Sequence, residues 1–219
     1  MEKDILMDSH TSKLLELLTR LLCDTHCECT ADAVYLFAQT QDNQDSVLSA
    51  AGGLLDQSLV HRVLILQTTA RCGYPGYEYW REKLTASGIP DDCIQGVNLE
   101  AEIALNTLVE AEALIDHARL NGYENLYITA SPFHQLRAYM TSVTAAMRKF
   151  PGLNLYSHAG NPLPWLESVA HSQGNCMGTR AALIHSELGR IEKYQEKGDL
   201  ASVESVLEHL NNRESRGQL

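Results

Sequence analysis

The sequence lacks long hydrophobic runs and an excess of basic residues. No stretch of its 219 residues approaches the roughly 18 apolar positions that a membrane-spanning helix needs, and residues 1–30 contain no apolar run of signal-peptide length. The 17 Lys and Arg residues are outnumbered by 28 Asp and Glu residues, which gives a formal net charge of -11. Because nucleic acids and anionic membranes bind to local positive fields, neither is an expected partner. The sequence therefore favours a cytoplasmic protein without membrane insertion.

Glycine-rich phosphate-binding motifs are missing as well. Neither G-x-G-x-x-G nor G-x-x-x-x-G-K-[ST] occurs in the chain, so neither of these nucleotide-binding turns is expected. Cysteine is also scarce. Six cysteines in a chain of this length are too few for a disulfide scaffold and are typical of reduced cytosolic thiols.

The segment "CDTHCEC", residues 23–29, concentrates half of these cysteines. Four of its side chains are of types that bind metal ions: Cys23, His26, Cys27 and Cys29. Structural zinc sites usually pair two short knuckles across a distance, because four ligands this close together strain a tetrahedron. We therefore predict no metal and interpret the segment as a helix end and its turn, with inert thiols. A zinc-dependent module is the minor alternative.

Short apolar segments alternate with amphipathic ones along most of the chain. Strands are predicted at residues 32–39, 61–69, 93–97, 125–130 and 153–158. Helices are predicted at residues 11–22, 43–58, 76–87, 101–120 and 132–149, and two or three more follow residue 165, before a frayed tail at 213–219. Near-continuous apolar strands separated by helices indicate an α/β fold with a mostly parallel sheet covered on both faces.

The chain is predicted to form a single domain over residues 1–219. An N-terminal helix and turn occupy residues 1–28, the sheet core occupies residues 30–160, and a helical extension occupies residues 161–219. Neither an internal repeat nor a low-complexity linker divides the chain.

Candidate ligand contacts follow several predicted strands. In an open parallel sheet, ligands bind beyond the carboxyl ends of the strands, where helix N-termini point their N–H groups into the crevice. Asn43 follows the first strand, Thr68 and Thr69 stand at the carboxyl end of the second and lead to Glu78 at a helix start, and His158 stands at the carboxyl end of the fifth. Turn and N-cap chemistry is the competing interpretation of Asn43, and His158 could instead cap a helix beginning at "PLPW".

The clearest functional signal follows the fourth strand, in "ITASPFHQLRAYM". Ser131 is a suitable N-cap and Pro132 suits the first helical turn, so His134 and Arg137 share one face of the helix. The helix terminus disfavours the imidazolium form of His134, whereas Arg137 remains a permanent cation. With free backbone N–H groups, this pattern indicates a pocket for phosphate or carboxylate. The alternative is that His134 caps its own turn and Arg137 pairs with a carboxylate of the preceding helix.

These residues resemble a known signature. Residues 131–138, "SPFHQLRA", are similar to the "TSxxHxxRA" motif of the YdcF, SanA and ElyC domain family of bacterial proteins, whose biochemical activity is largely undefined. The segment "GIPDDCI" resembles the family's "GVPxxxI", Asn106 and Thr107 stand at its Asn-Thr pair, and Glu78 stands at its helix-opening Glu. The resemblance covers roughly residues 30–150.

This resemblance implies a Rossmann-like three-layer α/β/α fold with about five strands and a cleft at the strand ends. It also implies a nucleotide-like or other anionic small ligand, of which S-adenosylmethionine is one candidate type. The chain departs from the family pattern at Ala104 and Val109, where the family has Ser and Glu, although Glu110 is adjacent. Ala130 replaces the Thr of the motif, and the family's glycine-rich turn after the first strand is missing.

The combined expectation is a protein that binds a small anionic or nucleotide-like ligand, as a hydrolase or transferase. In this hypothesis His134 is a hydrogen-bond donor or general acid/base and Arg137 clamps the anion. Ser131 caps the helix and contacts the anion, while Glu78 and Asn106 position the ligand or a water. No side chain has the pattern of a nucleophile held by an adjacent base, so a covalent mechanism is not predicted.

A second hypothesis is a non-catalytic sensor or scaffold. Its basis is the leucine stripe of the first helix and the amphipathic last helix, through which the protein would form a homodimer. In the C-terminal region, Arg180, Glu187 and Arg190 invite an active-site interpretation. Because Glu187 and Arg190 are three residues apart with Lys193 beyond, we instead predict an ordinary solvated charge pattern.

Overall fold

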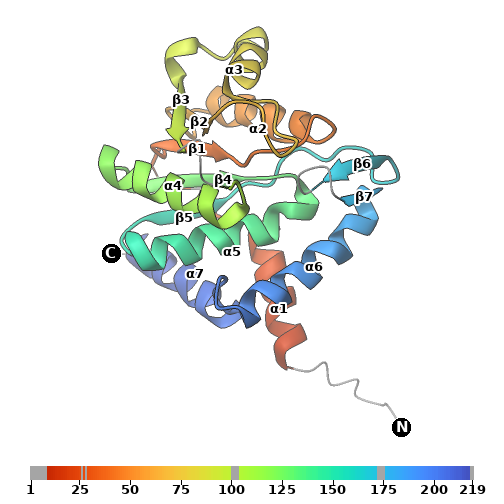
Figure 1. Cartoon of the computed structure of the whole chain (residues 1–219). Helices are drawn as coiled ribbons and strands as arrows, with labels where there is room; N and C mark the ends of the chain where they lie inside the picture. The colour runs from red at the N-terminus through yellow and green to blue at the C-terminus, as the bar shows by residue number, and fades with distance from the viewer. Residues whose placement is uncertain (1–8, 26, 28, 100–103, 172–175, 218–219) are drawn as a thin grey trace.

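The fold is a parallel sheet between layers of helices (Figure 1). It is seen in a computed structural model that describes residues 9–25, 27, 29–99, 104–171 and 176–217. The helices are α1 (Ser9–Leu22), α2 (Gln44–Asp56), α3 (Tyr77–Ala86), α4 (Thr107–Asn121), α5 (Pro132–Lys149), α6 (Arg180–Glu196) and α7 (Val203–Gly217), with a 3-10 turn η1 (Asp91–Cys93). The strands are β1 (Ala33–Leu36), β2 (Val63–Gln67), β3 (Ile94–Asn98), β4 (Asn125–Thr129), β5 (Asn154–Ser157), β6 (Ser168–His171) and β7 (Cys176–Thr179).

Strands β1 to β5 form one parallel sheet in the order β3-β2-β1-β4-β5. The chain winds outward in one direction from β1 to β3 and then crosses back to place β4 on the other side of β1. Ligands of open α/β sheets bind at such a switch point, outside the carboxyl ends of the strands. The predicted α/β, Rossmann-like three-layer fold is confirmed, and each of the five predicted strands is present.

Successive side chains of each strand point to opposite faces of the sheet and so belong to two separate hydrophobic cores. Val34 and Leu36 of β1 face the layer of α2 and α3, whereas Ala33 and Tyr35 face the layer of α4 and α5. These four residues are fully buried, as expected for a strand covered on both faces. Figure 1 shows the two layers above and below the sheet.

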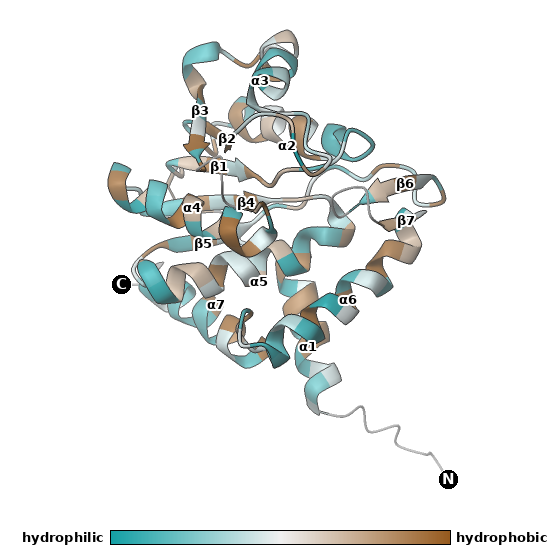
Figure 2. Cartoon of the chain, in the orientation of Figure 1, coloured by the Kyte–Doolittle hydropathy of each residue, from teal (hydrophilic) through white to brown (hydrophobic). Residues whose placement is uncertain are grey.

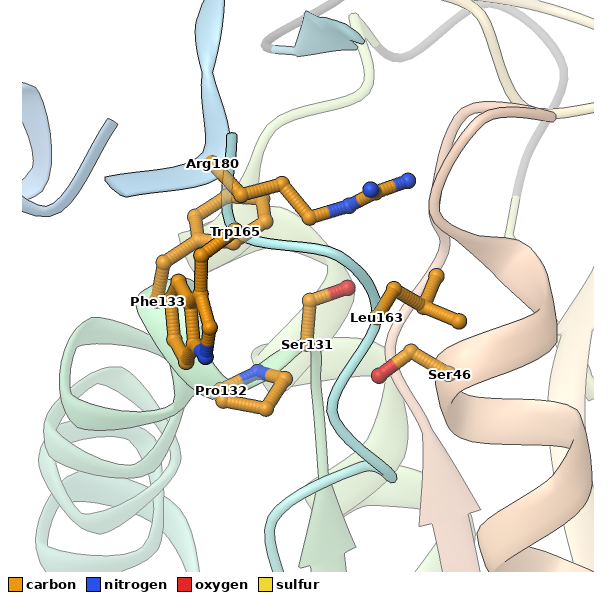
Figure 3. A pocket seen from close by; sticks show the side chains of 7 residues that line it. All are labelled: Ser46, Ser131, Pro132, Phe133, Leu163, Trp165 and Arg180. Carbon is orange, nitrogen blue, oxygen red and sulfur yellow. The ribbon is translucent and has the colours of Figure 1, made fainter. Parts of the chain in front are cut away.

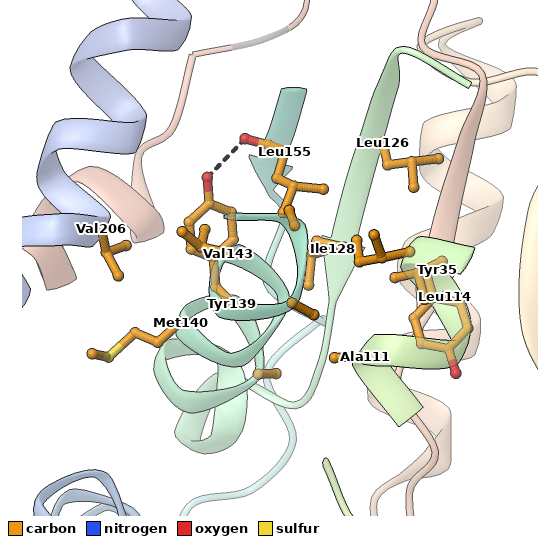
Figure 4. Close-up of a cluster of buried hydrophobic side chains, with 14 of the residues drawn as sticks. Tyr35, Ala111, Leu114, Leu126, Ile128, Tyr139, Met140, Val143, Leu155 and Val206 are labelled. Atoms are coloured by element: carbon orange, nitrogen blue, oxygen red, sulfur yellow. Dashed lines mark hydrogen bonds between the residues drawn. The ribbon is translucent and has the colours of Figure 1, made fainter. Parts of the chain in front are cut away.

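Helix α5 is covered on nearly every side. The sheet and α4 lie against it, and α1, α6 and α7 contact it from the outer layer. Tyr139 points into the core, where its hydroxyl donates to the carbonyl of Leu155 at 2.7 Å (Figure 4). The hydroxyls of Thr141 and Thr144 donate to carbonyls one turn earlier, so these buried polar groups are satisfied within the helix.

The two ends of the described chain pack together. Leu17 and Leu21 of α1 are buried in the same core as Val206 and Leu210 of α7. The predicted fraying from residue 213 is wrong, because α7 continues to Gly217. The leucine stripe of the first helix is therefore used within the chain.

An antiparallel hairpin, β6 with β7, precedes α6 and was not expected from the sequence. The helix predicted to begin at "PLPW" is wrong, because residues 161–164 have no regular structure and residues 165–166 form a turn. Arg180, at the start of α6, attaches this region to the sheet by donating to Asn43 Oδ1 and to the carbonyls of Asp42 and Pro164.

Along α6, apolar and polar residues alternate (Figure 2). None of the described helices is long and apolar enough to cross a membrane.

Candidate functional site

A cleft of about 640 Å³ lies at the carboxyl ends of β1 and β4. Its walls come from six segments: the loop that follows β1, the loop that follows β2, the start of α4, the first turns of α5, the end of β6, and one face of α6 with the loop beyond it. The cleft therefore opens at the switch point of the sheet, where the order of strands reverses.

The carboxylate of Glu187 holds together the deep wall of this cleft. Its Oε2 lies 2.6 Å from His134 Nδ1 and 2.6 Å from Arg137 Nε. Its Oε1 lies 3.0 Å from His171 Nε2, 2.8 Å from Arg190 Nη1 and 3.2 Å from Arg137 Nη2. Glu187 is 3% exposed, so this is a buried anion surrounded by donors from α5, α6 and β6.

The network shifts the pKa values of Glu187 and His134. Burial alone would raise the pKa of Glu187, but hydrogen bonds and charge from His134, His171 and Arg137 hold that pKa far below its ordinary value. Burial and the Arg137 guanidinium lower the pKa of His134 to about 4, against the opposing effect of Glu187. His134 is thus neutral at pH 7, and the 2.6 Å contact with an ionised carboxylate assigns its proton to Nδ1. In that tautomer, Nε2 carries no proton and accepts hydrogen bonds.

Arg137 connects the network to α4. Its Nη1 donates to Thr107 Oγ1 at 2.7 Å, and Thr107 opens the helix. The side chain of Asn106 caps the same helix by accepting from the backbone N–H groups of Leu108 and Val109. The positive end of the α4 dipole therefore lies at the cleft wall beside the Arg137 guanidinium.

Glu110 is the second buried carboxylate of the cleft. It stands one turn after Thr107 on the same face of α4, and its Oε1 accepts from Tyr35 Oη at 2.9 Å and from the Ala38 N–H at 2.7 Å. Burial raises its pKa to about 7, even though these two hydrogen bonds and the charge of Arg137 act in the opposite direction. Glu110 therefore exchanges a proton near neutral pH.

His134, His171 and Glu187 also form a set that could hold a metal ion, with ligand atoms within 4.8 Å of one another. Both Glu187 oxygens, however, already accept from the guanidinium groups of Arg137 and Arg190. Two permanent cations on the same carboxylate would repel a divalent metal ion. The donor set fits an anion-binding wall better than a metal centre.

Four of the residues predicted for the site come together. His134, Arg137, Asn106 and Thr107 all line the cleft. Asn106 does so as the N-cap of α4, not from within a helix as predicted from periodicity. The predicted alternative for Arg137, a carboxylate of the preceding helix, is wrong, because its partner Glu187 lies on α6.

Two predicted residues lie inside the fold near the cleft but not on its wall. Ser131 occupies the N-cap position of α5 without a capping hydrogen bond from its side chain, and its hydroxyl donates to Gln39 Oε1 at 3.0 Å. It faces a small separate cavity beside Arg180 (Figure 3). Asn43 is fully buried and binds Thr40, the Ala170 carbonyl and Arg180. The observed role of Asn43 is to anchor the loop.

Four other predicted residues lie away from the cleft. The side chain of Glu78 is 75% exposed on α3 and pairs with Arg81 at 3.6 Å. Thr68 and Thr69 follow β2 and are not part of the lining. His158 packs its ring against Tyr127, with centroids 6.2 Å apart. The geometry therefore does not bring these four side chains to His134.

Glu187 and His171 were not predicted for the site from the sequence, and Glu110 was named without a role. Glu187 was interpreted as solvated, which is wrong at 3% exposure. A signal existed, because Leu183 and Ile191 lie one turn before and after it, which puts Glu187 on the apolar stripe of α6. His171 lies on the same buried face of β6 as Val169, two residues before it, but that strand was not predicted.

In the "CDTHCEC" segment, His26 and Glu28 lie outside the described residues. Cys23 is exposed, Cys27 is buried, and the Sγ atoms of Cys27 and Cys29 are 3.3 Å apart. Asp24 binds Arg213 in a buried ion pair.

No family model matches the chain, and no match to a curated protein is found.

Proposed function

We propose that this protein binds a small anionic, nucleotide-like ligand in the cleft and acts on it as a hydrolase or transferase. The observation that carries the proposal is the pairing of two arginines, Arg137 and Arg190, with a single buried carboxylate, Glu187. The two guanidinium charges exceed the single carboxylate charge, so the cleft wall carries a positive surplus. The dipole of α4 adds to the same field.

The resemblance to the YdcF, SanA and ElyC family is retained as a proposal. Its support is that the two motif side chains His134 and Arg137 line one cleft together with Asn106 and Thr107, the residues of the second motif. The motifs are far apart in the sequence, and the hydrogen bond from Arg137 to Thr107 joins them.

Glu110 favours an enzyme over a sensor. A carboxyl group with a pKa of about 7 that lines a cleft is suited to general acid/base catalysis at neutral pH. In hydrolysis of a phosphate ester, ionised Glu110 would take a proton from water, whose oxygen bonds to phosphorus as the ester P–O bond breaks. The protonated Glu110 would then give that proton to the departing oxygen, so the group returns to its starting state.

The alternative hypothesis, a non-catalytic scaffold that dimerises through its terminal helices, has less support than the enzyme. Its basis was the apolar stripe of α1 and the amphipathic face of α7, and both pack into the core of this chain through Leu17, Leu21, Val206 and Leu210. A homodimer through the terminal helices would need other surfaces.

Calorimetric titration with inorganic phosphate tests the binding proposal. Arg190→Gln is the informative variant, because the Arg190 side chain is 25% exposed and its loss leaves Arg137 to neutralise Glu187. We expect phosphate affinity to fall about tenfold or more, the effect of losing one charged hydrogen bond. The matched control is Arg119→Gln, which removes the same charge from an exposed side chain at the far end of α4. Phosphate binding that is absent, or equal in both variants, contradicts the proposal.

Turnover is tested with p-nitrophenyl phosphate as the probe. We expect slow hydrolysis by the wild type. Glu110→Gln should retain phosphate binding but lose the hydrolysis, because Gln cannot exchange a proton. Binding without hydrolysis by the wild type would leave the sensor as the better description.

A further inference from the structure

The face of α6 that lines the cleft carries a row of cations. Arg190, Lys193 and Lys197 follow one another at spacings of three and four residues, which places them on one side of the helix. At about 1.5 Å of rise per residue, the row extends about 10 Å along the helix axis. It begins at the Glu187 network and continues toward the end of α6.

Along this row, the cations make fewer ion pairs with carboxylates of the protein. Arg190 donates to Glu187 at 2.8 Å. Lys193 and Lys197 are exposed, and within the described part of the chain no carboxylate is close enough to pair with either ammonium group. Lys197 instead lies over the ring of Tyr194 at 5.8 Å. Two lysines therefore line the cleft without an ion-pair partner from the described residues.

The acidic side chains of the cleft neutralise only part of the positive charge of Arg190, Lys193 and Lys197. Glu112 already pairs with Lys149 at 3.8 Å, and Glu110 binds Tyr35 at the opposite, inner end. Asp199 is the one further acidic residue of the lining. The α6 side of the cleft therefore has a positive surplus that extends beyond Arg190.

We infer that the ligand is an oligophosphate or a molecule that carries one, such as a nucleoside diphosphate or triphosphate. One phosphate binds at Arg190 and Arg137, and the next phosphates extend along Lys193 and Lys197. A cleft of about 640 Å³ is far larger than a single phosphate needs and lies in the usual range for whole small-molecule ligands. This inference rests on the proposed anion binding and specifies its ligand class.

The experiment is a calorimetric series with inorganic phosphate, pyrophosphate and tripolyphosphate at one fixed ionic strength, since ionic strength alone changes such affinities. For the wild type, we expect affinity to rise at least tenfold from phosphate to tripolyphosphate. In the double variant Lys193→Gln/Lys197→Gln, phosphate affinity should stay within twofold of the wild type, while the rise with chain length disappears. The matched control is Lys13→Gln/Lys83→Gln, which removes the same charge from partly exposed lysines of α1 and α3, away from the cleft, and should keep the full rise.

The outcomes separate the two proposals. Equal affinity for the three anions, or a rise that survives in the Lys193 and Lys197 double variant, overturns the oligophosphate inference alone. A rise that is lost equally in the Lys13 and Lys83 control also overturns it, because net charge would then be the cause. Failure of all three anions to bind overturns the proposed function together with the inference.

Discussion

The carboxylate of Glu187 sets the electrostatics of the cleft because two arginines and two histidines converge on it. A buried guanidinium without a counter-ion is costly, so Glu187 allows Arg137 to be placed inside the fold at 6% exposure. Arg190 then adds a second cation to an anion that is already neutralised. At the residue scale, the surplus charge of the site therefore comes from α6.

Glu110 gives the site a pH dependence whose sign can be worked out. Its pKa is about 7 in the folded chain and near 4.5 in the unfolded chain. Between these pH values the folded state keeps a proton that the unfolded state has lost, so rising pH favours unfolding. Below pH 4.5 both states are protonated and above about pH 7 both are ionised, and there the effect is constant.

We therefore expect the wild type to lose stability relative to Glu110→Gln as pH rises from about 5 to about 8. The relative loss is on the order of 3 kcal/mol, from the size of the pKa change. Urea unfolding of both proteins at the two pH values measures it, and any constant cost of the amide cancels in the comparison. Glu112→Gln, two residues after Glu110 on α4 and with a side chain 34% exposed, serves as the control and should show little change. A difference that does not vary with pH would contradict the assignment.

What the sequence reveals of the site depends on how far apart its parts lie in the chain. His134 and Arg137 are three residues apart on one helix, so local periodicity and the start of α5 predict their shared face. Glu187 and His171 reach them from a hairpin and a helix that pack back onto α5, and no local pattern specifies that packing. Glu187 was predicted to be solvated from its three-residue spacing to Arg190, although its position on the apolar stripe of α6 indicates burial.

At the scale of elements, the strands were predictable because each is a short apolar run and the sheet needs such runs on both faces. The hairpin of β6 and β7 was not predictable in the same way. Its strands have only four residues each, and Met177 is 67% exposed, so alternation is weak. Its position is set by Arg180 and by contacts with the loop after β1.

The contact between α2 and the chain after β5 depends on Gly160. A Cβ atom there would overlap Ser46 Oγ and would lie 2.9 Å from the Ser46 carbonyl and 3.0 Å from the Ala130 carbonyl. We expect Gly160→Ala to cost about 1–3 kcal/mol of unfolding free energy, as overpacking does. Guanidinium unfolding measures this cost.

The control for this prediction is Gly52→Ala in the middle of α2. A Cβ atom at Gly52 meets nothing within 4 Å, so the helix should gain about 0.5–1 kcal/mol from the better helix former. An equal effect at both glycines would show that steric overlap at Gly160 is not the cause.

At the scale of the whole molecule, the fold depends on its two ends being joined. Arg213 of α7 binds Asp24, which follows α1, through Nη1 at 2.8 Å, and it stacks over the ring of Tyr156 at 4.3 Å. Both partners of the ion pair are buried. Alpha helices at opposite ends of the sequence thereby cover α5 as one layer.

We expect Arg213→Ala to destabilise the fold by about 3–5 kcal/mol, because it leaves the Asp24 carboxylate buried without its partner. Hydrogen exchange should accelerate in α1 as well as in α7. Arg216→Ala, an exposed change on the same helix, should stay within about 0.5 kcal/mol of the wild type. Faster exchange confined to α7 would contradict the coupling of the two ends.

The position of Glu187, after all five strands of the parallel sheet, has a consequence for biosynthesis. As the chain emerges from the ribosome, the five strands of the parallel sheet are complete at Ser157, well before α6 exists. Until Glu187 arrives, Arg137 has no buried counter-ion, and the start of α5 must stay hydrated. A nascent chain can therefore assemble its sheet early, but the Glu187 network that forms the deep wall of the cleft is complete only after α6 has been made.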